Sequence, residues 1–369
     1  MRKTISGDRV FFFIVLILVV GGIATFASAA LGLLARPDSA LGRLAFTQLA
    51  LGLIPGVIAL LILRFSPQAL IAQGAPWIYG ITVVATALVF VPGLGETVNG
   101  ATRWIDVGFT TIQPGEFLKI GVVLMLAFHL ARVKGKLHEF SHGLIPFLLI
   151  VGVPSLILLL QPNTSTVIVI GIMATALYIL AGAPFRDIAI IGVIAVVLLG
   201  VLLMMRPYLM DRVATYFDPA RDPLSSGYQI QQSLIAIGSG QIIGRGFGQS
   251  AQKFNYLPEP VGDSVFAVYG EEFGFVGAVL LILLFTAFAA RGFYIASYAS
   301  TMFGSLTAAG LTLIIVISAF LNIGAMLAIL PLTGLPLPFV SHGGTALLAA
   351  LASVGIILNV AAHRKSKRA

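Results

Sequence analysis

Long apolar runs constrain the fold of this chain more strongly than any other feature of its sequence. An α-helix needs about 20 predominantly apolar residues to cross the hydrocarbon core of a bilayer. Runs near or above that length fall near residues 10–34, 44–63, 76–93, 116–131, 144–160, 164–181, 188–205, 264–290, 302–330 and 344–362. Only 10% of the residues are charged, compared with about 25% in a soluble domain. The sequence therefore predicts an all-α, polytopic membrane protein of about ten transmembrane helices, with a single membrane domain over residues 1–369.

The distribution of charge predicts how these helices are oriented. If the N-terminus lies inside, the inside segments contain only three acidic residues, Asp8, Glu139 and Asp187. They contain many basic residues: Arg2, Lys3, Arg9, Arg64, Arg132, Lys134, Lys136, Arg186, Arg291, Arg364, Lys365, Lys367 and Arg368. In the remaining segments the acidic residues outnumber the basic ones. The positive-inside rule therefore places both termini in the cytoplasm, and this topology accounts for the formal net charge of +8 without a nucleic-acid partner.

Residues 206–263 form a connection between the seventh and eighth predicted helices, on the outside of the membrane. Connections this long are usually functional or disordered. Ile230, Leu234 and Ile237 recur at helical spacing within residues 222–240, which predicts a short helix lying in the membrane surface. Several glycines follow, and glycine permits close approach of the backbone to a ligand. We predict that this loop, with its interfacial helix, carries the catalytic region.

Four carboxylates lie where this loop meets the next apolar run. They are Glu259, Asp263, Glu271 and Glu272. Carboxylates at the edge of a bilayer cost free energy, and by default they indicate a functional site. Asp263 has two compatible interpretations, a helix N-cap or a general base at the membrane surface. Glu271 and Glu272 are expected to pair with cations on neighbouring helices.

A second candidate region lies in the polar segment 93–115 and the helix that follows it. Glu116 and Lys119 are three residues apart, so they share one helix face. They form either a local ion pair, worth about 0.3 kcal/mol, or part of a cationic clamp with Arg103. Arginine offers a planar fork for phosphate oxygens, and lysine offers a point charge. With Lys253 near the long loop, this clamp is predicted to hold an anionic head group at the outer leaflet.

Residues 138–142 match the pattern His-Glu-x-x-His, which on a helix places two imidazoles on one face for zinc. Here the pattern lies in a short, basic inside loop, and no third metal ligand is evident although one is expected. Two solvated histidines, His138 and His142, are therefore favoured over an intramembrane metalloprotease. The chain has no cysteine, which excludes disulfides and thiolate metal sites.

Six stretches, taken together and in order, resemble the SEDS family (shape, elongation, division and sporulation), which includes FtsW and RodA. The resemblance spans most of the chain and favours FtsW over RodA. The stretches are GATRWIDVG (100–108), QPGEFLK (113–119), YQIQQSLIAIGSG (228–240), GRGFGQSAQKFNYLPEP (244–260), DSVFAVYGEEFGFVG (263–277) and LPLPFVSHGGTALL (335–348). The chain departs from the usual pattern at Asn163, at Val261-Gly262 and at His342, where the family often has Asp, His-Thr and Tyr.

The resemblance implies about ten membrane helices and a peptidoglycan glycosyltransferase that polymerises lipid II and releases undecaprenyl diphosphate during septal cell-wall synthesis. The family's essential loop aspartate matches Asp263, and its first outside motif matches Arg103, Glu116 and Lys119. We expect Lys253, Glu259 and Ser341 to complete the substrate site.

The implied partners are lipid II, the undecaprenyl-linked glycan, a class B penicillin-binding protein and other divisome membrane proteins, with no nucleic acid. Mg²⁺ or Mn²⁺ is the one candidate cofactor, no metal-ligating residues are assigned, and no organic cofactor is expected. The implied location is the bacterial inner (cytoplasmic) membrane, with the active site facing the periplasm or outside. Two alternatives remain open from the residues alone: a flippase for the lipid-linked precursor, and a non-catalytic division scaffold.

Overall fold

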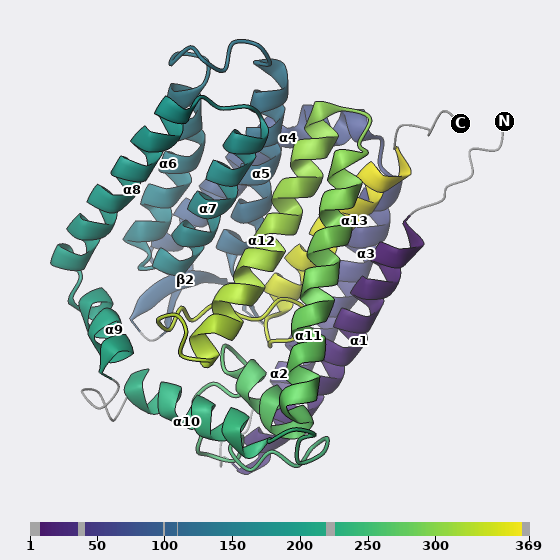
Figure 1. Ribbon diagram of the computed structural model, residues 1–369, viewed down its shortest axis with the longest axis vertical. Helices are drawn as coiled ribbons and strands as arrows, with labels where there is room; N and C mark the ends of the chain where they lie inside the picture. Colours follow the sequence, from purple (N-terminus) through teal and green to yellow (C-terminus); the bar gives the residue numbers. More distant parts are fainter. Residues whose placement is uncertain (1–7, 36–40, 99, 109, 219–225, 364–369) are drawn as a thin grey trace.

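The computed structural model describes residues 8–35, 41–98, 100–108, 110–218 and 226–363 (Figure 1). Helices dominate these residues. In chain order the elements are α1 (Arg9–Leu31), η1 (Gly32–Ala35), α2 (Leu41–Phe46), η2 (Thr47–Leu53), α3 (Ile54–Phe65), α4 (Gln68–Ala87), η3 (Leu88–Phe90), β1 (Gly95–Val98), β2 (Ala101–Asp106), β3 (Thr111–Ile112), α5 (Pro114–Arg132), α6 (Leu144–Leu160), α7 (Thr164–Leu180), α8 (Phe185–Met205), α9 (Pro207–Phe217), α10 (Ser226–Ser239), α11 (Val265–Ser297), α12 (Met302–Met326) and α13 (Gly344–Ala362).

The number of membrane-length helices confirms the predicted architecture. Within the described ranges, eight helices are long and apolar enough to cross a membrane, and the shorter apolar helices α6 and α7 complete the set. The second of the eight runs from Gly42 to Phe65 and joins α2, η2 and α3 into one span. The predicted bounds are less accurate than the number. Helix α4 begins at Gln68 rather than near residue 76, because its first turns are too polar to register as an apolar run.

The core of the bundle is built from α5, α12 and α13, most of whose residues are buried. Small residues allow these helices to pack closely. A Cβ added at Gly310 of α12 would lie 2.7 Å from the Val123 side chain of α5. Helix α8 is the opposite case, since Asp187 is its one buried residue, and it lies at the periphery of the bundle (Figure 1).

The long connections gather at one end of the bundle, where β2, α9 and α10 lie (Figure 1). Strands β1, β2 and β3 form a small antiparallel sheet in that order, with an irregular register between Glu96 and Thr97. This sheet was not predicted, because strands of two to six residues carry too little alternation to detect. Helix α9 was not predicted either. Helix α10 lies within residues 222–240, where the sequence predicts a short helix, and its position in the membrane surface stays a prediction.

Helix α11 is broken at Gly274, whose φ of 64° and ψ of −164° are not helical. This region of backbone conformation is accessible essentially only to glycine. The loop that follows α10 supplies hydrogen bonds on both sides of the break. Four backbone bonds do this: Arg245 N to Glu271 O (3.0 Å), Gly246 N to Glu272 O (3.0 Å), Phe275 N to Gln241 O (2.8 Å) and Val276 N to Ile242 O (3.0 Å). The break therefore leaves these backbone groups paired, as buried polar groups require.

Glycine is required where this loop touches α11. A Cβ at Gly240 would lie 2.1 Å from Gly270 O, and a Cβ at Gly244 would lie 2.1 Å from Glu272 O. The sequence predicts that the loop glycines let a ligand approach the backbone closely. In the structure, Gly240 and Gly244 instead permit backbone-to-backbone packing against α11.

Candidate functional site

A cavity of about 350 Å³ opens at the end of the bundle that carries the long connections. Its walls come from the small sheet, the start of α5, the turn between α6 and α7, and the two loops that precede α11 and α13. Four of the residues singled out from the sequence line it together: Arg103, Glu116, Glu259 and Asp263. Segments far apart in the chain thus place carboxylates and a guanidinium around one space.

A tight turn presents Asp263 to this cavity. Its first residue, Glu259, has a φ of 46°, in the left-handed region that non-glycine residues rarely adopt. The conformation is held because the Glu259 carbonyl accepts hydrogen bonds from Gly262 N (3.0 Å) and Ser264 N (3.2 Å). Backbone outliers of this kind cluster at functional sites.

Both the side chain and the backbone of Asp263 are fixed by neighbouring helices. Gln229 of α10 donates to Asp263 Oδ1 at 3.2 Å, and Asn322 of α12 donates to the Asp263 carbonyl at 2.7 Å. The N-cap interpretation of Asp263 is wrong: Ser264 occupies the N-cap position of α11, and no side chain forms a capping hydrogen bond there. The Asp263 carboxylate is therefore not used to cap the helix.

The surroundings of Asp263 tune its protonation. Burial, and to a smaller extent the negative charge of Glu259, raise the pKa of this carboxyl to about 6. The hydrogen bond from Gln229 and the positive charge of Arg212 act in the opposite direction and lower the pKa. A base whose pKa lies close to neutral can both accept and release a proton under working conditions.

Ser341 holds the turn from behind rather than lining the cavity. Its hydroxyl donates to Gly262 O at 2.6 Å and accepts from Leu337 N at 2.8 Å. The adjacent backbone adds a bond from His342 N to Val261 O at 2.6 Å. The loop before α13 is thereby joined to the residues that immediately precede Asp263.

Arg103 projects from β2 onto the turn between α6 and α7. Its Nη2 donates to Pro162 O, and its Nε donates to Gln161 O at 3.4 Å. Burial lowers the pKa of Arg103, and the nearby charge of Arg212 lowers it further. An arginine remains charged in spite of such shifts. The positive charge of Arg212 on α9 therefore reaches both Arg103 on β2 and Asp263.

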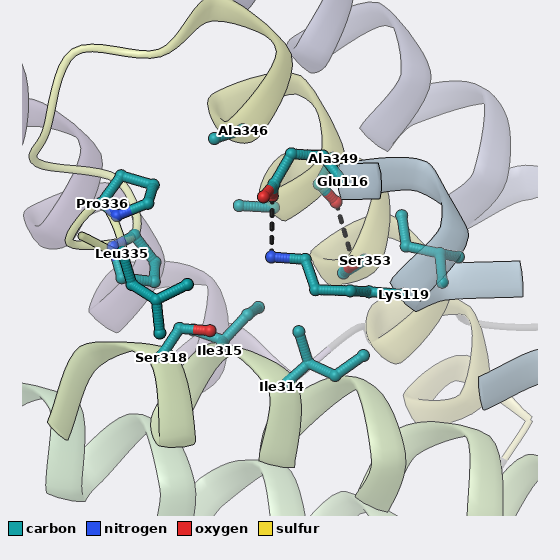
Figure 2. Close-up of a pocket in the computed structure, with 13 residues that line it drawn as sticks. Glu116, Lys119, Ile314, Ile315, Ser318, Leu335, Pro336, Ala346, Ala349 and Ser353 are labelled. Atoms are coloured by element: carbon teal, nitrogen blue, oxygen red, sulfur yellow. Dashed lines mark hydrogen bonds and ion pairs between the residues drawn. The ribbon is translucent and has the colours of Figure 1, made fainter. Parts of the chain in front are cut away.

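Glu116 and Lys119 form the local ion pair, with Lys119 Nζ 2.8 Å from Glu116 Oε2. Glu116 also borders a second, much smaller cavity of about 30 Å³, which Lys119 lines. Figure 2 shows the Lys119 ammonium directed at the Glu116 carboxylate and facing Ser318 across this space. Lys119 does not line the larger cavity, so the structure places it behind Glu116 rather than beside Arg103.

Lys253 is not brought to the cavity, which corrects its assignment to the substrate site. Its side chain is fully buried, and its ammonium donates to Glu272 Oε1 (2.8 Å), Ser28 Oγ (3.0 Å) and Gly248 O (2.8 Å). These three acceptors match the three donors of an ammonium. A phosphate would have to displace them, so Lys253 fixes the loop to α11 and α1.

Glu271 and Glu272 pair with cations as predicted, but these cations do not lie on neighbouring helices. Glu271 lies 3.4 Å from Arg245 Nη1 and accepts from Ser250 Oγ at 2.5 Å, while Glu272 pairs with Lys253. Both cations come from the loop after α10 rather than from neighbouring helices. The two adjacent carboxylates both accept hydrogen bonds from Ser250, and together they anchor the loop to α11.

The His-Glu-x-x-His pattern does not form the geometry that zinc binding requires. Residues 138–142 lie in turns rather than in a helix, and His142 Nδ1 lies 2.9 Å from Glu139. In the part of the chain that the structure describes, no three His, Asp or Glu side chains gather as a metal site. The Mg²⁺ or Mn²⁺ ion expected from the sequence stays a prediction.

Three residues at the site were missed by reasoning from sequence. Gln229 and Asn322 position Asp263, and Arg212 of α9 donates to Leu332 O at 3.0 Å while its charge reaches Asp263. Asn322 could have been found as a lone amide in an apolar helix. Arg212 could not, because α9 is too short to be recognised as part of the site.

Comparison with known proteins identifies the family of this chain. A model for the cell cycle proteins FtsW, RodA and SpoVE matches residues 8–366. The chain belongs to this family. It is 40% identical to stage V sporulation protein E of Bacillus subtilis over 279 residues, which are 75% of this chain and 76% of the relative. It is 42% identical to the probable peptidoglycan glycosyltransferase FtsW of Alcanivorax borkumensis over 287 residues, 77% of this chain and 74% of the relative.

Two solved structures share the fold over nearly the whole chain. One is a chain of a peptidoglycan synthase complex, described as coordinating polymerization and crosslinking, with a TM-score of 0.79 and 29% identity. The other is the rod shape determining protein RodA of Thermus thermophilus, with a TM-score of 0.70 and 27% identity. Each comparison covers 98% of this chain and 99% of the other. The protein is therefore an integral membrane protein of the FtsW, RodA and SpoVE type.

Proposed function

We propose that this protein is a peptidoglycan glycosyltransferase that polymerises lipid II at the outer face of the bacterial cytoplasmic membrane. The observation that carries the proposal is the placement of Asp263, with its pKa raised to about 6, in the same cavity as Arg103. A tuned base beside a cation is the combination that transfer of a sugar from a diphosphate needs. The names of the related FtsW proteins support the same activity.

In the proposed reaction, Asp263 accepts the proton of the 4-hydroxyl on the GlcNAc of lipid II. The hydroxyl oxygen forms a new bond to the anomeric carbon of the growing chain, and the bond from that carbon to the diphosphate oxygen breaks. Negative charge develops on the departing undecaprenyl diphosphate. Arg103 and Arg212 would stabilise that charge, which is worth most in a site where water is scarce.

The other residues of the cavity have supporting roles in this proposal. Glu259 raises the pKa of Asp263, and Gln229 orients its carboxylate. Glu116 faces the cavity and pairs with Lys119, which lies behind it. Lys119 would therefore contribute a positive charge near the substrate without touching it. Ser341 holds the turn that carries Asp263.

The finer assignments rest on the relatives. The resemblance to FtsW supports a septal role, and the similarity to a chain of a peptidoglycan synthase complex supports a class B penicillin-binding protein as the partner. The prevalence of basic residues at the opposite end of the bundle supports cytoplasmic termini and a cavity that opens to the outside.

Polymerisation of purified lipid II tests the proposal. Asp263→Asn should reduce the rate of glycan formation by at least about 100-fold, the contribution of a general base, while the helical content remains that of the wild type. Asp106→Asn is the matched control, because Asp106 is an exposed aspartate on β2 whose carboxylate accepts from Gly108 N. An Asp263→Asn protein with the wild-type rate would refute the proposal. A wild-type protein that binds or translocates lipid II without forming glycan would favour a transporter.

A further inference from the structure

A buried glutamine lies in an irregular part of the second membrane span. Gln48 belongs to η2, a π-helical segment in which Ile54 N donates to Leu49 O, five residues earlier. Its side chain is fully buried. Short π-helical insertions within α-helices occur frequently at functional sites, and a buried amide is costly unless all its polar atoms are hydrogen-bonded.

Both polar atoms of the Gln48 amide contact the loop before α13. Gln48 Nε2 donates to Ser341 O at 3.3 Å, and Gln48 Oε1 accepts from Gly343 N at 2.9 Å. The side chain therefore clamps the backbone on both sides of His342. A single amide that satisfies one donor and one acceptor of the same loop fixes the position and the orientation of that loop.

The backbones of η2 and α13 also touch directly. A Cβ at Gly344 would lie 2.5 Å from Thr47 O, and a Cβ at Gly52 would lie 2.9 Å from Gly344 Cα. This contact brings η2 close enough for Gln48 to reach the loop. The π-helical segment and the start of α13 are thus packed backbone to backbone at the wall of the cavity, which Thr47 and Gly344 line.

The clamped loop is connected to both halves of the candidate site. On one side Ser341 Oγ donates to Gly262 O at 2.6 Å, adjacent to Asp263. On the other side Gln113 N donates to Thr345 Oγ1 at 3.4 Å, at the start of the helix that carries Glu116. The loop from Ser341 to Thr345 therefore links the Asp263 turn to α5, and Gln48 is the side chain that holds this loop from the opposite side.

We infer that Gln48 is a positioning residue for the transfer reaction: through the Ser341–Gly343 backbone it holds the Asp263 turn in register with the rest of the cavity. The inference rests on the proposed function. Loss of the amide would free the loop, admit water beside Asp263 and misalign its carboxylate. A misplacement of about 1 Å can reduce a rate by roughly 100-fold.

The protonation of Asp263 provides a readout that a merely structural role would not change. The charged and titratable groups around it are Glu259 on its own loop, Arg212 on α9, Arg103 on β2 and Glu116 on α5. His342 shares the cavity wall, and burial lowers its pKa to about 4, so it is neutral near pH 6. Because burial is the largest cause of the raised pKa of Asp263, admitting water should lower that pKa.

The experiment compares Gln48→Leu, Gln48→Glu and Asn359→Leu in full-length protein. Leucine removes both hydrogen bonds, and a protonated glutamate reproduces both. Asn359 is the matched control, because it is also a fully buried amide that joins α13 to the end of α3, with bonds to Leu63 O, Arg64 O and Ser66 O. It lies at the end of the bundle away from the cavity.

Glycan formation from lipid II gives kcat, KM and the acid limb of the pH–rate profile. Gln48→Leu should lower kcat by roughly ten- to 100-fold with little change in KM, and should move the acid limb to lower pH. Gln48→Glu should have most of the wild-type rate measured at the same acidic pH, and should fall below the wild-type rate as the pH rises and the introduced carboxyl ionises. Asn359→Leu should leave the acid limb unchanged. The inference would be overturned if the acid limb of Gln48→Leu lay at the wild-type pH. It would also be overturned if Asn359→Leu moved the acid limb as far as Gln48→Leu does.

Two further measurements separate the possible failures. If Gln48→Leu does not fold, the inference is tested by the rate of Gln48→Glu divided by the wild-type rate at each pH. A ratio that does not change with pH overturns the inference. If the wild type forms no glycan, the proposed function fails. The inference is then tested without turnover, by infrared titration of the Asp263 carboxyl, identified as the band that Asp263→Asn removes. An unshifted titration in Gln48→Leu overturns it.

Discussion

Replacing Lys253 with methionine should destabilise the protein strongly while leaving substrate affinity unchanged. Methionine keeps the apolar stem of the side chain and removes the ammonium. Glu272, fully buried, then loses its cation and keeps its hydrogen bonds from Ser28 Oγ (2.6 and 2.8 Å) and Ser250 N (3.4 Å). Breaking a buried ion pair by removing one partner costs about 3–5 kcal/mol. The remaining hydrogen bonds to Glu272 favour the lower end, about 3 kcal/mol.

The double variant Lys253→Met with Glu272→Gln isolates the cause of this effect. Because it removes both charges, the uncompensated carboxylate disappears. Replacement of both members of a buried ion pair is often close to neutral, so the double variant should recover most of the stability lost in the single variant. Chemical unfolding in detergent micelles, followed by helical circular dichroism, measures the free energy of unfolding of each protein.

Kinetics distinguish this account from the role in substrate binding that the sequence indicated. If Lys253 fixes the loop, the folded fraction of Lys253→Met should show the wild-type KM for lipid II. A variant that unfolds at the wild-type denaturant concentration but has a raised KM would refute the structural reasoning. It would show that the ammonium leaves Glu272 to bind substrate.

Two further predictions concern the cavity and the helix break. Burial and Glu259 raise the pKa of Asp263 to about 6, and only the carboxylate accepts a proton, so the rate should fall as the pH drops through about 6. Initial rates that stay constant down to pH 4.5 would contradict this. Gly274→Ala should lower the free energy of unfolding by about 3 kcal/mol, since an added Cβ would also lie 2.3 Å from Gly244 N. Gly171→Ala, where a Cβ meets nothing within 4 Å, is the control in thermal melts.

The membrane architecture was predictable because it depends on a property that is local in sequence. An apolar run of sufficient length must be a helix in a bilayer, so the number of spans followed from the residues alone. The bounds were less certain where polar residues extend a helix, as in the first turns of α4 from Gln68. The sheet around Arg103 was missed because it depends on pairing between strands and not on a periodic pattern within one strand.

The site was predictable only in part, for a related reason. Arg103, Glu259 and Asp263 were found because charged residues stand out beside apolar runs, and the structure brings them to one cavity. Lys253 stood out equally, yet its partner is Glu272, about two turns into the next helix. Sequence shows that a charge is present but not which opposite charge it meets. The contacts that position Asp263 come from two uncharged amides, Gln229 and Asn322, of which only Asn322 stands out, as a lone amide in an apolar helix.

The four backbone bonds across the break in α11 have an evolutionary consequence. They fix the length of the connection between Ile242 and Arg245, because a residue added or deleted there would shift one pair of these bonds relative to the other. Relatives should therefore vary in length elsewhere in their outer loops and keep this connection constant. For the same reason, this connection and the first turns of α11 should be inherited together. A chimaeric protein of this family should take both segments from the same parent.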